Sequence, residues 1–499
     1  MTKHKVYLAV DIGAGSGRVV AGILQKERLR LEEVYRFSND PVKLTGSLHW
    51  NAPGLFLEIK HGIRKAAAKY GKALACAGVD TWGVDYGYLD KHGRLLGIPF
   101  CYRDQRTDDV SKALFEIIPS REIYETTGIQ FMFFNTLFQI YSEVLDGSPV
   151  HNTADRLLFM PDLINYWLTG VKTNESTIAS TSQMIDARSG LWARNMLKKL
   201  GIPSSFLAET VDPCSCIGHL LPDIAEETGA GKLNVVAPGC HDTASAVAAV
   251  PAAGSNYVYI SSGTWSLMGF LSKKPVITDK SFEHGFTNER GVENDYRILK
   301  NISGLWIIQE CRKKWAAEGQ EMNYDTLTSL ASGAKPFAAF IYPDWSGFAK
   351  PGDMPSRIKD FCRKTGQKAP GDTGSIVRTA LEALALRYRS VLSNIEEIRG
   401  EKVDTIHIVG GGCLNTLLNQ FAADATGKRV VAGPTEATAT GNIMAQLLAD
   451  GMIASLNEGR DILKESIETN VYEPGDRGRW EDAYSSYIKI EGILQAQRF

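Results

Sequence analysis

The sequence lacks a long hydrophobic run and lacks an excess of charge of either sign. No uninterrupted apolar stretch approaches the ~18 residues that a membrane span needs, and Asp11 interrupts the first apolar run too early for a signal-peptide core. The 55 basic and 57 acidic residues leave a net charge of -2. Without a basic excess there is no electrostatic case for nucleic acid or an anionic membrane. We therefore expect a cytoplasmic protein with neither kind of partner.

The cysteines lack the spacing of a secreted disulfide framework. There are eight of them, scattered along the chain, and we expect reduced thiols. One local group, Cys214, Cys216 and His219, offers three potential metal ligands. Structural zinc needs four ligands, and no fourth lies nearby in the sequence. The residues therefore favour ordinary thiols over a zinc site.

Two glycine-interrupted hairpins occur in the two halves of the chain. The apolar run 6–11 is followed by a glycine turn and a second apolar run at 19–24. The run 257–260, the polar turn 261–264 and the run 265–270 repeat that pattern. At 499 residues the chain is long for one hydrophobic core. The repetition predicts two related halves, although two unrelated hairpins would look the same.

Strand and helix patterns alternate between and after these hairpins. The runs 75–80 and 406–409 are typical of buried strands, and apolar residues have helical spacing in 163–168, 376–398 and 416–425. This mixture predicts an α/β protein whose sheets are covered by helices. The turn-rich segment 251–256 marks the expected boundary, which gives domains 1–251 and 252–499.

Two turns are candidates for binding phosphate. In Asp11-Ile12-Gly13-Ala14-Gly15-Ser16-Gly17-Arg18 the glycines let backbone N–H groups approach a phosphate, and Asp11 is placed to hold a water of hydrated Mg²⁺. No Gly-Lys-Ser/Thr follows, so this is not a P-loop, and an apolar strand stands where a dinucleotide fingerprint needs a helix. The second candidate is Ser261-Ser262-Gly263-Thr264. Each has a plain alternative as a hairpin turn, the second one capped by its own hydroxyls.

Three further segments contain candidate residues for catalysis or ligand binding. In His241-Asp242-Thr243, at the expected start of a helix, Asp242 can be a helix cap, the general base for phosphoryl transfer to an alcohol, or both. The glycines at 410–412 allow a flat ring to lie on bare backbone, or form a flexible loop. The segment 80–85 sets Trp82 beside Gly83 and two acids. That composition suits a sugar and equally suits a core tryptophan.

In this order the segments resemble the FGGY family of carbohydrate kinases over nearly the whole chain. The motifs that carry the resemblance are Val10–Gly13, Val79–Asp85, Tyr102–Thr107, Gly128–Phe131, Met160–Asp162, His241–Val247, Ser261–Leu267, Leu299–Ile302, Gly410–Cys413 and Ala432–Ala437. A colinear set of this kind is far more specific than one glycine turn. Gly15 stands where many relatives carry a hydroxyl residue.

The resemblance implies a fold and a set of roles. The fold is two ribonuclease-H-like domains, as in actin and hexokinase, around a central cleft, the first holding the sugar and the second the adenosine. The activity is transfer of the ATP terminal phosphoryl group to the C1 hydroxyl of a ketose, with L-rhamnulose favoured. Asp242 would be the base. The sugar would meet Trp82, Gly83, His241, Asp242, Thr243 and Asn301. ATP would meet Ala14, Gly15, Ser16, Gly17, Arg18, Thr264, Gln309 and Gly411, and Asp11 would hold Mg²⁺ through water.

Two alternatives remain at this point. Another ketose, L-fuculose, L-xylulose or L-ribulose, differs by one methyl group or stereocentre, a difference worth only ~1–3 kcal/mol in a pocket. A non-catalytic relative, either a filament protein or a sugar-responsive regulator, would keep the fold without the site. No basic helix-turn-helix stretch precedes Asp11, and a filament protein has no reason to keep Trp82, His241 and Asp242. Oligomeric state does not follow from the sequence.

Overall fold

The computed structural model describes residues 5–25, 28–252, 254–475 and 477–496. This chain forms two compact units. The first unit comprises 1–251, 271–299 and 436–467, and the second comprises 252–270, 300–435 and 468–499. The first unit is therefore built from three separate stretches of chain, two of them beyond residue 251.

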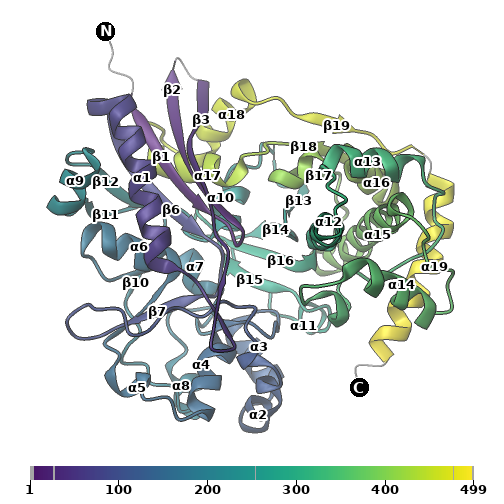
Figure 1. The fold of residues 1–499 in the computed structure, drawn as a ribbon, viewed down its shortest axis with the longest axis horizontal. Helices are drawn as coiled ribbons and strands as arrows, with labels where there is room; N and C mark the ends of the chain where they lie inside the picture. Colours follow the sequence, from purple (N-terminus) through teal and green to yellow (C-terminus); the bar gives the residue numbers. More distant parts are fainter. Residues whose placement is uncertain (1–4, 26–27, 253, 476, 497–499) are drawn as a thin grey trace. The chain divides into compact units, whose positions relative to one another are not determined.

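A mixed sheet forms the centre of the first unit (Figure 1). Its six described strands lie in the order β11 (Ser215–His219), β12 (Asn234–Ala237), β6 (Leu74–Thr81), β1 (Val6–Ile12), β2 (Ser16–Gln25) and β3 (Arg28–Ser38). β1 pairs with β2 antiparallel and with β6 parallel. The predicted first hairpin and the strand predicted at 75–80 are thus confirmed.

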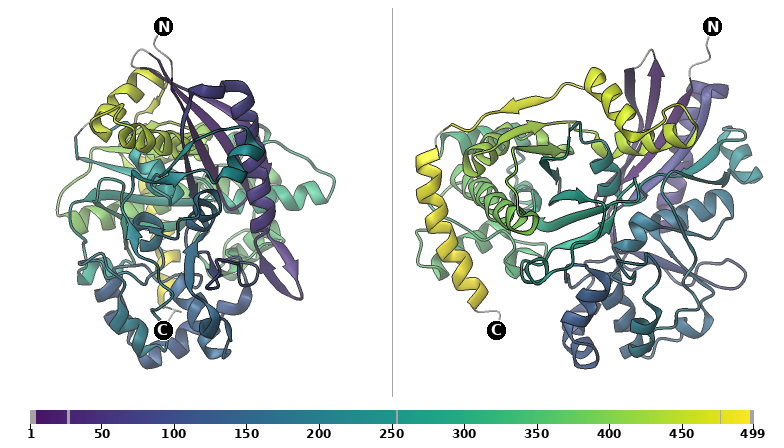
Figure 2. Two further views of the ribbon diagram at one scale, coloured as in Figure 1. Left: turned by 90° about the vertical axis from the view of Figure 1, so that its left-hand side faces the viewer. Right: turned by 180° about the vertical axis from the view of Figure 1, so that it is seen from behind.

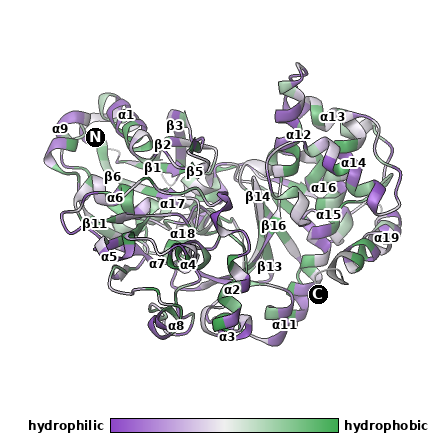
Figure 3. Ribbon diagram, turned by 60° about the horizontal axis from the view of Figure 1, so that its bottom comes forward, coloured by the Kyte–Doolittle hydropathy of each residue, from purple (hydrophilic) through white to green (hydrophobic). Residues whose placement is uncertain are grey.

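One face of this sheet packs on α1 (Ala52–Tyr70) and α6 (Met160–Thr169). Alternate residues of β1 point to one face, so Leu8 and Val10 join one buried cluster with Leu55 and Ile59 of α1. The opposite side of α1 is polar, and the helix carries both hydropathy colours in Figure 3. α1 begins at Asn51, whose side chain accepts a hydrogen bond from Gly54 N at 3.1 Å.

The other face of the sheet packs on α17 (Ala437–Ala449). Asn442 donates to Gly78 O at 3.1 Å and Gln446 donates to Leu8 O at 3.0 Å, so the helix is hydrogen-bonded to two strands. A Cβ on Gly78 would lie 2.6 Å from Asn442 Oδ1, which explains the glycine there. α10 (Asp242–Ala248) packs on α17. α18 (Leu456–Ser466) packs beside β3, and both can be followed by colour in Figure 2.

The rest of the first unit includes a two-stranded ribbon of β7 (Tyr86–Leu89) and β8 (Arg156–Phe159) and a set of short elements. Its helices are α2 (Val110–Ile117), α3 (Ser120–Thr127), α4 (Thr136–Leu145), α5 (Val150–Thr153), α7 (Ser176–Ser180), α8 (Arg194–Lys199), α9 (Pro222–Thr228) and α11 (Asp279–Glu283). Short strands are β4 (Val42–Leu44), β5 (Ser47–His49), β9 (Asn174–Glu175) and β10 (Thr210–Val211). Short 3₁₀ turns are η1 (Gly71–Ala73) and η2 (Gln105–Thr107).

A second sheet has the same arrangement of its central strands. Among the described residues its seven strands lie in the order β15 (Thr287–Arg290), β16 (Tyr296–Ser303), β14 (Trp265–Ser272), β13 (Tyr257–Ser262), β17 (Thr405–Val409), β18 (Arg429–Ala432) and β19 (Asn470–Tyr472). β13 pairs antiparallel with β14 and parallel with β17, as β1 does with β2 and β6. β15 and the first half of β16 belong to the first unit. The expected repeat of the hairpin is confirmed.

Helices pack around the central helix α15 (Thr373–Arg399) of the second unit. They are α12 (Trp306–Ala317), α13 (Tyr324–Gly333), α14 (Met354–Lys364), α16 (Thr416–Thr426) and α19 (Arg477–Ala496), with 3₁₀ turns η3 (Ser346–Phe348) and η4 (Gly411–Leu414). α15 begins in a capping box between Asp372 and Ser375 and ends at Gly400. The helices predicted at 376–398, 416–425 and 163–168 are confirmed.

All eight cysteines are free thiols, and six of them are buried. Among the residues that the structure describes, no helix has both the length and the apolar character to cross a bilayer.

Candidate active site

Three charged side chains meet at the ends of β1, β2 and β6 in the first unit. Asp11 and Asp80 are lateral neighbours on parallel strands, and Arg18 is the antiparallel partner of Asp11. Arg18 donates to Asp11 Oδ2 from Nε at 3.0 Å and from Nη2 at 2.8 Å, and it also pairs with Glu436 at the start of α17. The strand register therefore brings two carboxylates and one guanidinium together.

Asp80 is the most deeply buried member of this group. Its Oδ2 accepts a hydrogen bond from Asn442 Nδ2 at 2.5 Å, and its Oδ1 has no partner in the part of the chain described. Burial, and secondly the charge of Asp11, raise the pKa of Asp80 well above its usual range. A buried carboxylate oxygen with no donor, beside a second carboxylate, fits a hydrated cation. Mg²⁺ is bound in this way, by one or two carboxylates and several waters.

The predicted phosphate turn, Ala14 to Arg18, joins β1 to β2. Gly13 N donates to Ser16 O at 2.9 Å, which closes the turn, and Asn39 Nδ2 donates to Gly13 O at 2.8 Å. Gly15 and Ser16 are exposed, and a Cβ on Gly15 would meet no atom within 4 Å. The turn is thus held in shape by its own backbone and by Asn39, with its tip open to a ligand.

Asp242 begins helix α10, and His241 occupies the position just before it. The helix has no side-chain cap, so capping is not what the Asp242 carboxylate does here. Thr243 Oγ1 donates to Asp242 Oδ1 at 3.0 Å, and His241 Nε2 lies 3.4 Å from the same oxygen. The Asp242 side chain is 29% exposed, whereas His241 and Thr243 are buried. Desolvation, opposed by His241 and supported by Asp11, raises the pKa of Asp242.

A buried ion pair supports His241 from behind. Glu289 and Arg297 are cross-strand partners on β15 and β16, and Arg297 Nη2 lies 2.9 Å from Glu289 Oε2. The same guanidinium donates to His241 Nδ1 at 3.0 Å. His241 Nδ1 also lies 3.2 Å from Glu289 Oε2, so both members of the ion pair contact the imidazole on this side and hold its ring in place. Burial would raise the pKa of Glu289, but Arg297 and His241 lower it overall.

The segment that follows β6 places Trp82 and Gly83 beside His241. Thr81 N donates to Cys240 O at 2.9 Å, and a Cβ on Gly83 would lie 3.4 Å from His241 Nε2. Trp82 is buried, and its Nε1 donates to Asp85 Oδ2 at 2.9 Å. Trp50 Nε1 donates to the same oxygen at 2.6 Å. The two indoles lie against each other, with ring centroids 4.3 Å apart.

In the second unit the predicted nucleotide residues lie around the turn between β13 and β14. Thr264 Oγ1 donates to Gln309 Oε1 at 3.2 Å, so these two predicted residues are in contact. The glycine loop packs on the same turn, because a Cβ on Gly412 would lie 2.0 Å from Ser262 Oγ. Gly411 is exposed on η4, and Asn301 lies half-buried on β16.

The structure thus brings the predicted residues together in separate groups. Asp11 contacts Arg18, Gly83 lies beside His241, His241 and Thr243 contact Asp242, and Thr264 contacts Gln309. Sequence reasoning missed the residues behind them: Asp80 and Asp85 as anchors, Glu289, Arg297, Glu436 and Asn442. A usable signal existed for Arg297 only. It stands among Tyr296, Ile298 and Leu299 in β16, and a buried charge in such a setting is normally paired. Its partner Glu289 lies in a strand of polar residues, which gives no such signal.

Two adjoining family models match the chain, the N-terminal domain of the FGGY family of carbohydrate kinases at residues 6–249 and its C-terminal domain at 258–449. The chain belongs to the FGGY family of carbohydrate kinases and is a phosphotransferase with the two-domain α/β fold of that family.

Among curated proteins it is similar to the rhamnulokinase of Bacteroides thetaiotaomicron, with 42% identity over 96% of this chain and 98% of that protein. The rhamnulokinase of Oceanobacillus iheyensis is 40% identical over 93% and 97%. Among solved structures, a ligand-bound xylulose kinase from Lactobacillus acidophilus matches with a TM-score of 0.82 and 15% identity, covering 99% of each chain. Plasmodium falciparum glycerol kinase with ADP matches with a TM-score of 0.77 and 15% identity over 97% and 98%. At such identities the structures establish the fold alone.

Proposed function

We propose that this chain transfers the terminal phosphoryl group of ATP to the C1 hydroxyl of L-rhamnulose, giving L-rhamnulose 1-phosphate and ADP in the cytoplasm. The observation that carries the reaction is the Asp242 carboxylate, which is partly exposed among buried neighbours and held by Thr243 and His241. The choice of sugar is supported by curated relatives named rhamnulokinase at 36–42% identity over nearly the whole chain.

In this proposal Asp242 accepts the proton of the attacking hydroxyl, and its raised pKa makes it a stronger base than an exposed aspartate. His241 Nε2 lies 3.4 Å from the carboxylate and packs beside it, which limits its movement. Trp82, Gly83, Thr243 and Asn301 would contact the sugar. Positioning and electrostatic support carry most of a phosphoryl transfer, since there is little covalent chemistry for the protein to do.

The proposed contacts of ATP form two groups of residues. The backbone amides of Ala14 to Arg18 are the proposed contacts of the phosphates in the first unit, and Thr264, Gln309 and Gly411 are those of the nucleotide in the second. Asp11, with Asp80 beside it, would hold Mg²⁺ through water. When bound, the metal neutralises charge on the phosphate oxygens. The functional domains proposed here are 1–251, with the sugar and the base, and 252–499, with the adenosine.

The test is an ADP-release assay with ATP and Mg²⁺ against L-rhamnulose, L-fuculose, L-xylulose, L-ribulose and glycerol. We expect kcat/KM to be highest for L-rhamnulose. A higher value for another ketose would keep the kinase and discard the substrate, and no activity above background would overturn the proposal. In the same assay Asp11→Asn should need roughly 10–100-fold more Mg²⁺ for half-maximal rate. Asp223→Asn, an exposed change on α9, is its control.

A further inference from the structure

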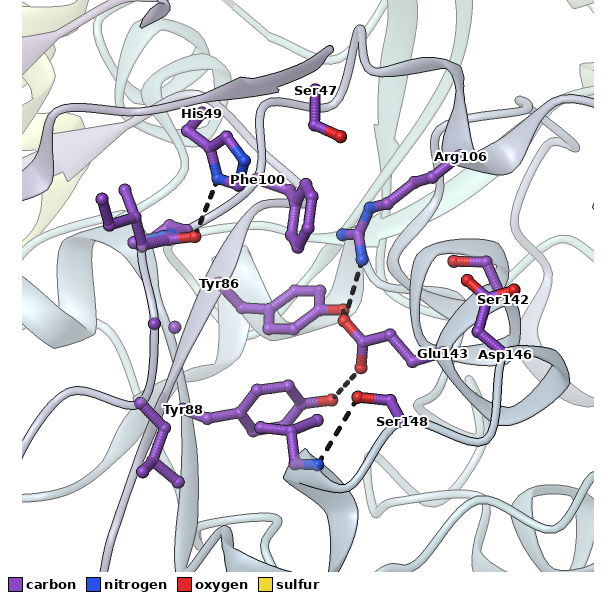
Figure 4. Close-up of a pocket in the computed structure, with 16 residues that line it drawn as sticks. Ser47, His49, Tyr86, Tyr88, Phe100, Arg106, Ser142, Glu143, Asp146 and Ser148 are labelled. Atoms are coloured by element: carbon purple, nitrogen blue, oxygen red, sulfur yellow. Dashed lines mark hydrogen bonds and ion pairs between the residues drawn. The ribbon is translucent and has the colours of Figure 1, made fainter. Parts of the chain in front are cut away.

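A cavity of about 570 Å³ lies in the first unit beside the β7–β8 ribbon (Figure 4). None of the residues proposed above to contact sugar, ATP or metal lines it. Tyr86 and Tyr88, on one face of β7, form one wall, while Asp85, one residue earlier, is hydrogen-bonded to Trp82. A volume of this size is typical of sites for small molecules. The cavity is therefore separate from the proposed sugar site, although the same strand connects them.

Two of the charged side chains of the cavity, Arg106 and Glu143, are paired with each other. Arg106 Nη1 and Glu143 Oε1 are 2.8 Å apart, and the hydroxyls of Tyr86 and Tyr88 each donate to Glu143 at 2.8 Å. Asp146, also on the lining, is exposed and has no side-chain partner in the described residues. The lining thus carries a net negative charge, which disfavours phosphorylated ligands such as ATP or a sugar phosphate.

Aromatic and aliphatic surfaces complete the lining. The Phe100 ring lies under the Arg106 guanidinium at 4.0 Å and beside the His49 ring at 4.4 Å, so its position is fixed on two sides. Further apolar lining comes from Leu96, Ile98, Pro99 and Val150, and hydroxyl groups come from Ser47, Ser142 and Ser148. Ring faces suit the C–H surface of a sugar, carboxylates and hydroxyls suit its hydroxyl groups, and aliphatic side chains suit a methyl group.

A chain of buried hydrogen bonds joins this lining to the proposed sugar site. Arg106 Nη2 donates to Gln139 Oε1 at 2.7 Å, and Gln139 Nε2 donates to Asp85 Oδ1 at 3.0 Å. The other oxygen of Asp85 accepts from Trp82 Nε1 at 2.9 Å. A shift of Arg106 on binding therefore changes the carboxylate that holds Trp82.

From these contacts we infer that the cavity is a second, non-catalytic site for an uncharged deoxy-sugar of the substrate's own class. Its occupation is transmitted to Trp82 through Arg106, Gln139 and Asp85. The sugar class rests on the proposed function. The cavity itself does not.

The test is equilibrium dialysis of the full chain with labelled L-rhamnulose, without ATP or Mg²⁺ so that no turnover occurs. We expect two moles bound per mole of chain. Phe100→Ala removes the ring wall and Val150→Trp fills the cavity, and either change should leave one mole. Phe56→Ala, a half-buried ring on α1 outside the cavity, should leave two. Two results would overturn the site. In the first, the wild type and both cavity variants each bind one mole of sugar. In the second, both cavity variants still bind two moles.

Enzyme kinetics test separately whether occupation of the cavity is transmitted to Trp82. The rate of ADP release should depart from a simple hyperbola as the ketose concentration rises, and Phe100→Ala should restore the hyperbola. Two bound moles with a hyperbolic wild-type curve would contradict the transmission. If the wild type binds one mole of sugar and both cavity variants bind none, the bound sugar lies in the cavity. That result would contradict the proposed function and support the cavity site.

Discussion

Glu289 and Arg297 face each other across the β15–β16 ladder, and Arg297 is wholly buried there while contacting Nδ1 of His241. One ion pair therefore both joins two strands and sets the orientation of the residue next to the proposed base. Removing one partner leaves a buried charge without compensation, which is more costly than removing both.

We predict that Arg297→Met or Glu289→Leu alone lowers the free energy of unfolding by about 3–5 kcal/mol, and that the double variant loses less than either. Urea unfolding of the three variants and the wild type measures this. A double variant that loses the sum of the two single losses would show that the charges are not coupled. Arg297→Lys keeps the positive charge but loses the planar set of N–H donors of the guanidinium. This variant should retain stability better than activity.

Asp242→Asn should abolish turnover and spare ATP binding. The amide cannot accept the proton of the attacking hydroxyl, so we expect kcat to fall by about 10²–10⁴-fold. The measurements are ADP release for turnover and calorimetric titration for the affinity for ATP. Asp223→Asn is the matched control on the exposed start of α9. Near-normal phosphorylation by Asp242→Asn would refute the assignment of the base.

The stability of the protein should depend on pH through Asp85. Burial, opposed by hydrogen bonds from Trp82, Trp50 and Gln139, raises the pKa of Asp85 to about 6. An unfolded aspartate titrates near ~3.9, so between about pH 4 and 6 the folded chain holds a proton that the unfolded chain has lost. The contribution of Asp85 to stability therefore falls as the pH rises through this window and is constant above it.

Urea unfolding at pH 4.5 and pH 7 tests this for the wild type and Asp85→Asn. Between these pH values the wild type should lose about 2 kcal/mol more stability than the variant, which has no such group to titrate. The same pH dependence in both proteins would mean that Asp85 titrates normally.

Two glycines of the first phosphate turn should differ in how well they tolerate an added side chain. A Cβ at Gly15 meets nothing within 4 Å, whereas one at Gly17 would lie 2.2 Å from the Phe37 ring. We expect Gly15→Ser to change stability by less than about 0.5 kcal/mol and, by adding a donor, to lower KM for ATP about 2–10-fold. Gly17→Ala should cost about 1–3 kcal/mol. Thermal unfolding measures the stability of both variants, and the dependence of the rate on ATP concentration gives KM. A destabilised Gly15→Ser would show that a side chain at the tip of the turn meets neighbouring atoms.

The sequence predicted the elements that local pattern controls. Alternating apolar residues and glycine turns identified both hairpins, and helical spacing identified α15 and α16. Motif resemblance gave Asp242 and its neighbours as candidates, because those residues occur in one short stretch. It did not find Arg297 behind His241, 56 positions away, or Asn442 on Asp80, 362 positions away. Contacts at such separations depend on strand register and helix packing, which no short segment encodes.

Helix α17 is made late in translation, yet it belongs to the first unit. Its Asn442 and Gln446 hydrogen-bond to Gly78, Asp80 and Leu8, and it covers a face of the first sheet. Until the ribosome has made residues 437–449, that face lacks α17 and Asp80 lacks the amide donor of Asn442. The proposed metal-binding carboxylates are therefore completed only when almost the whole polypeptide has been synthesised. A chain that terminates before residue 437 would leave the first unit unfinished even though its first 251 residues are intact.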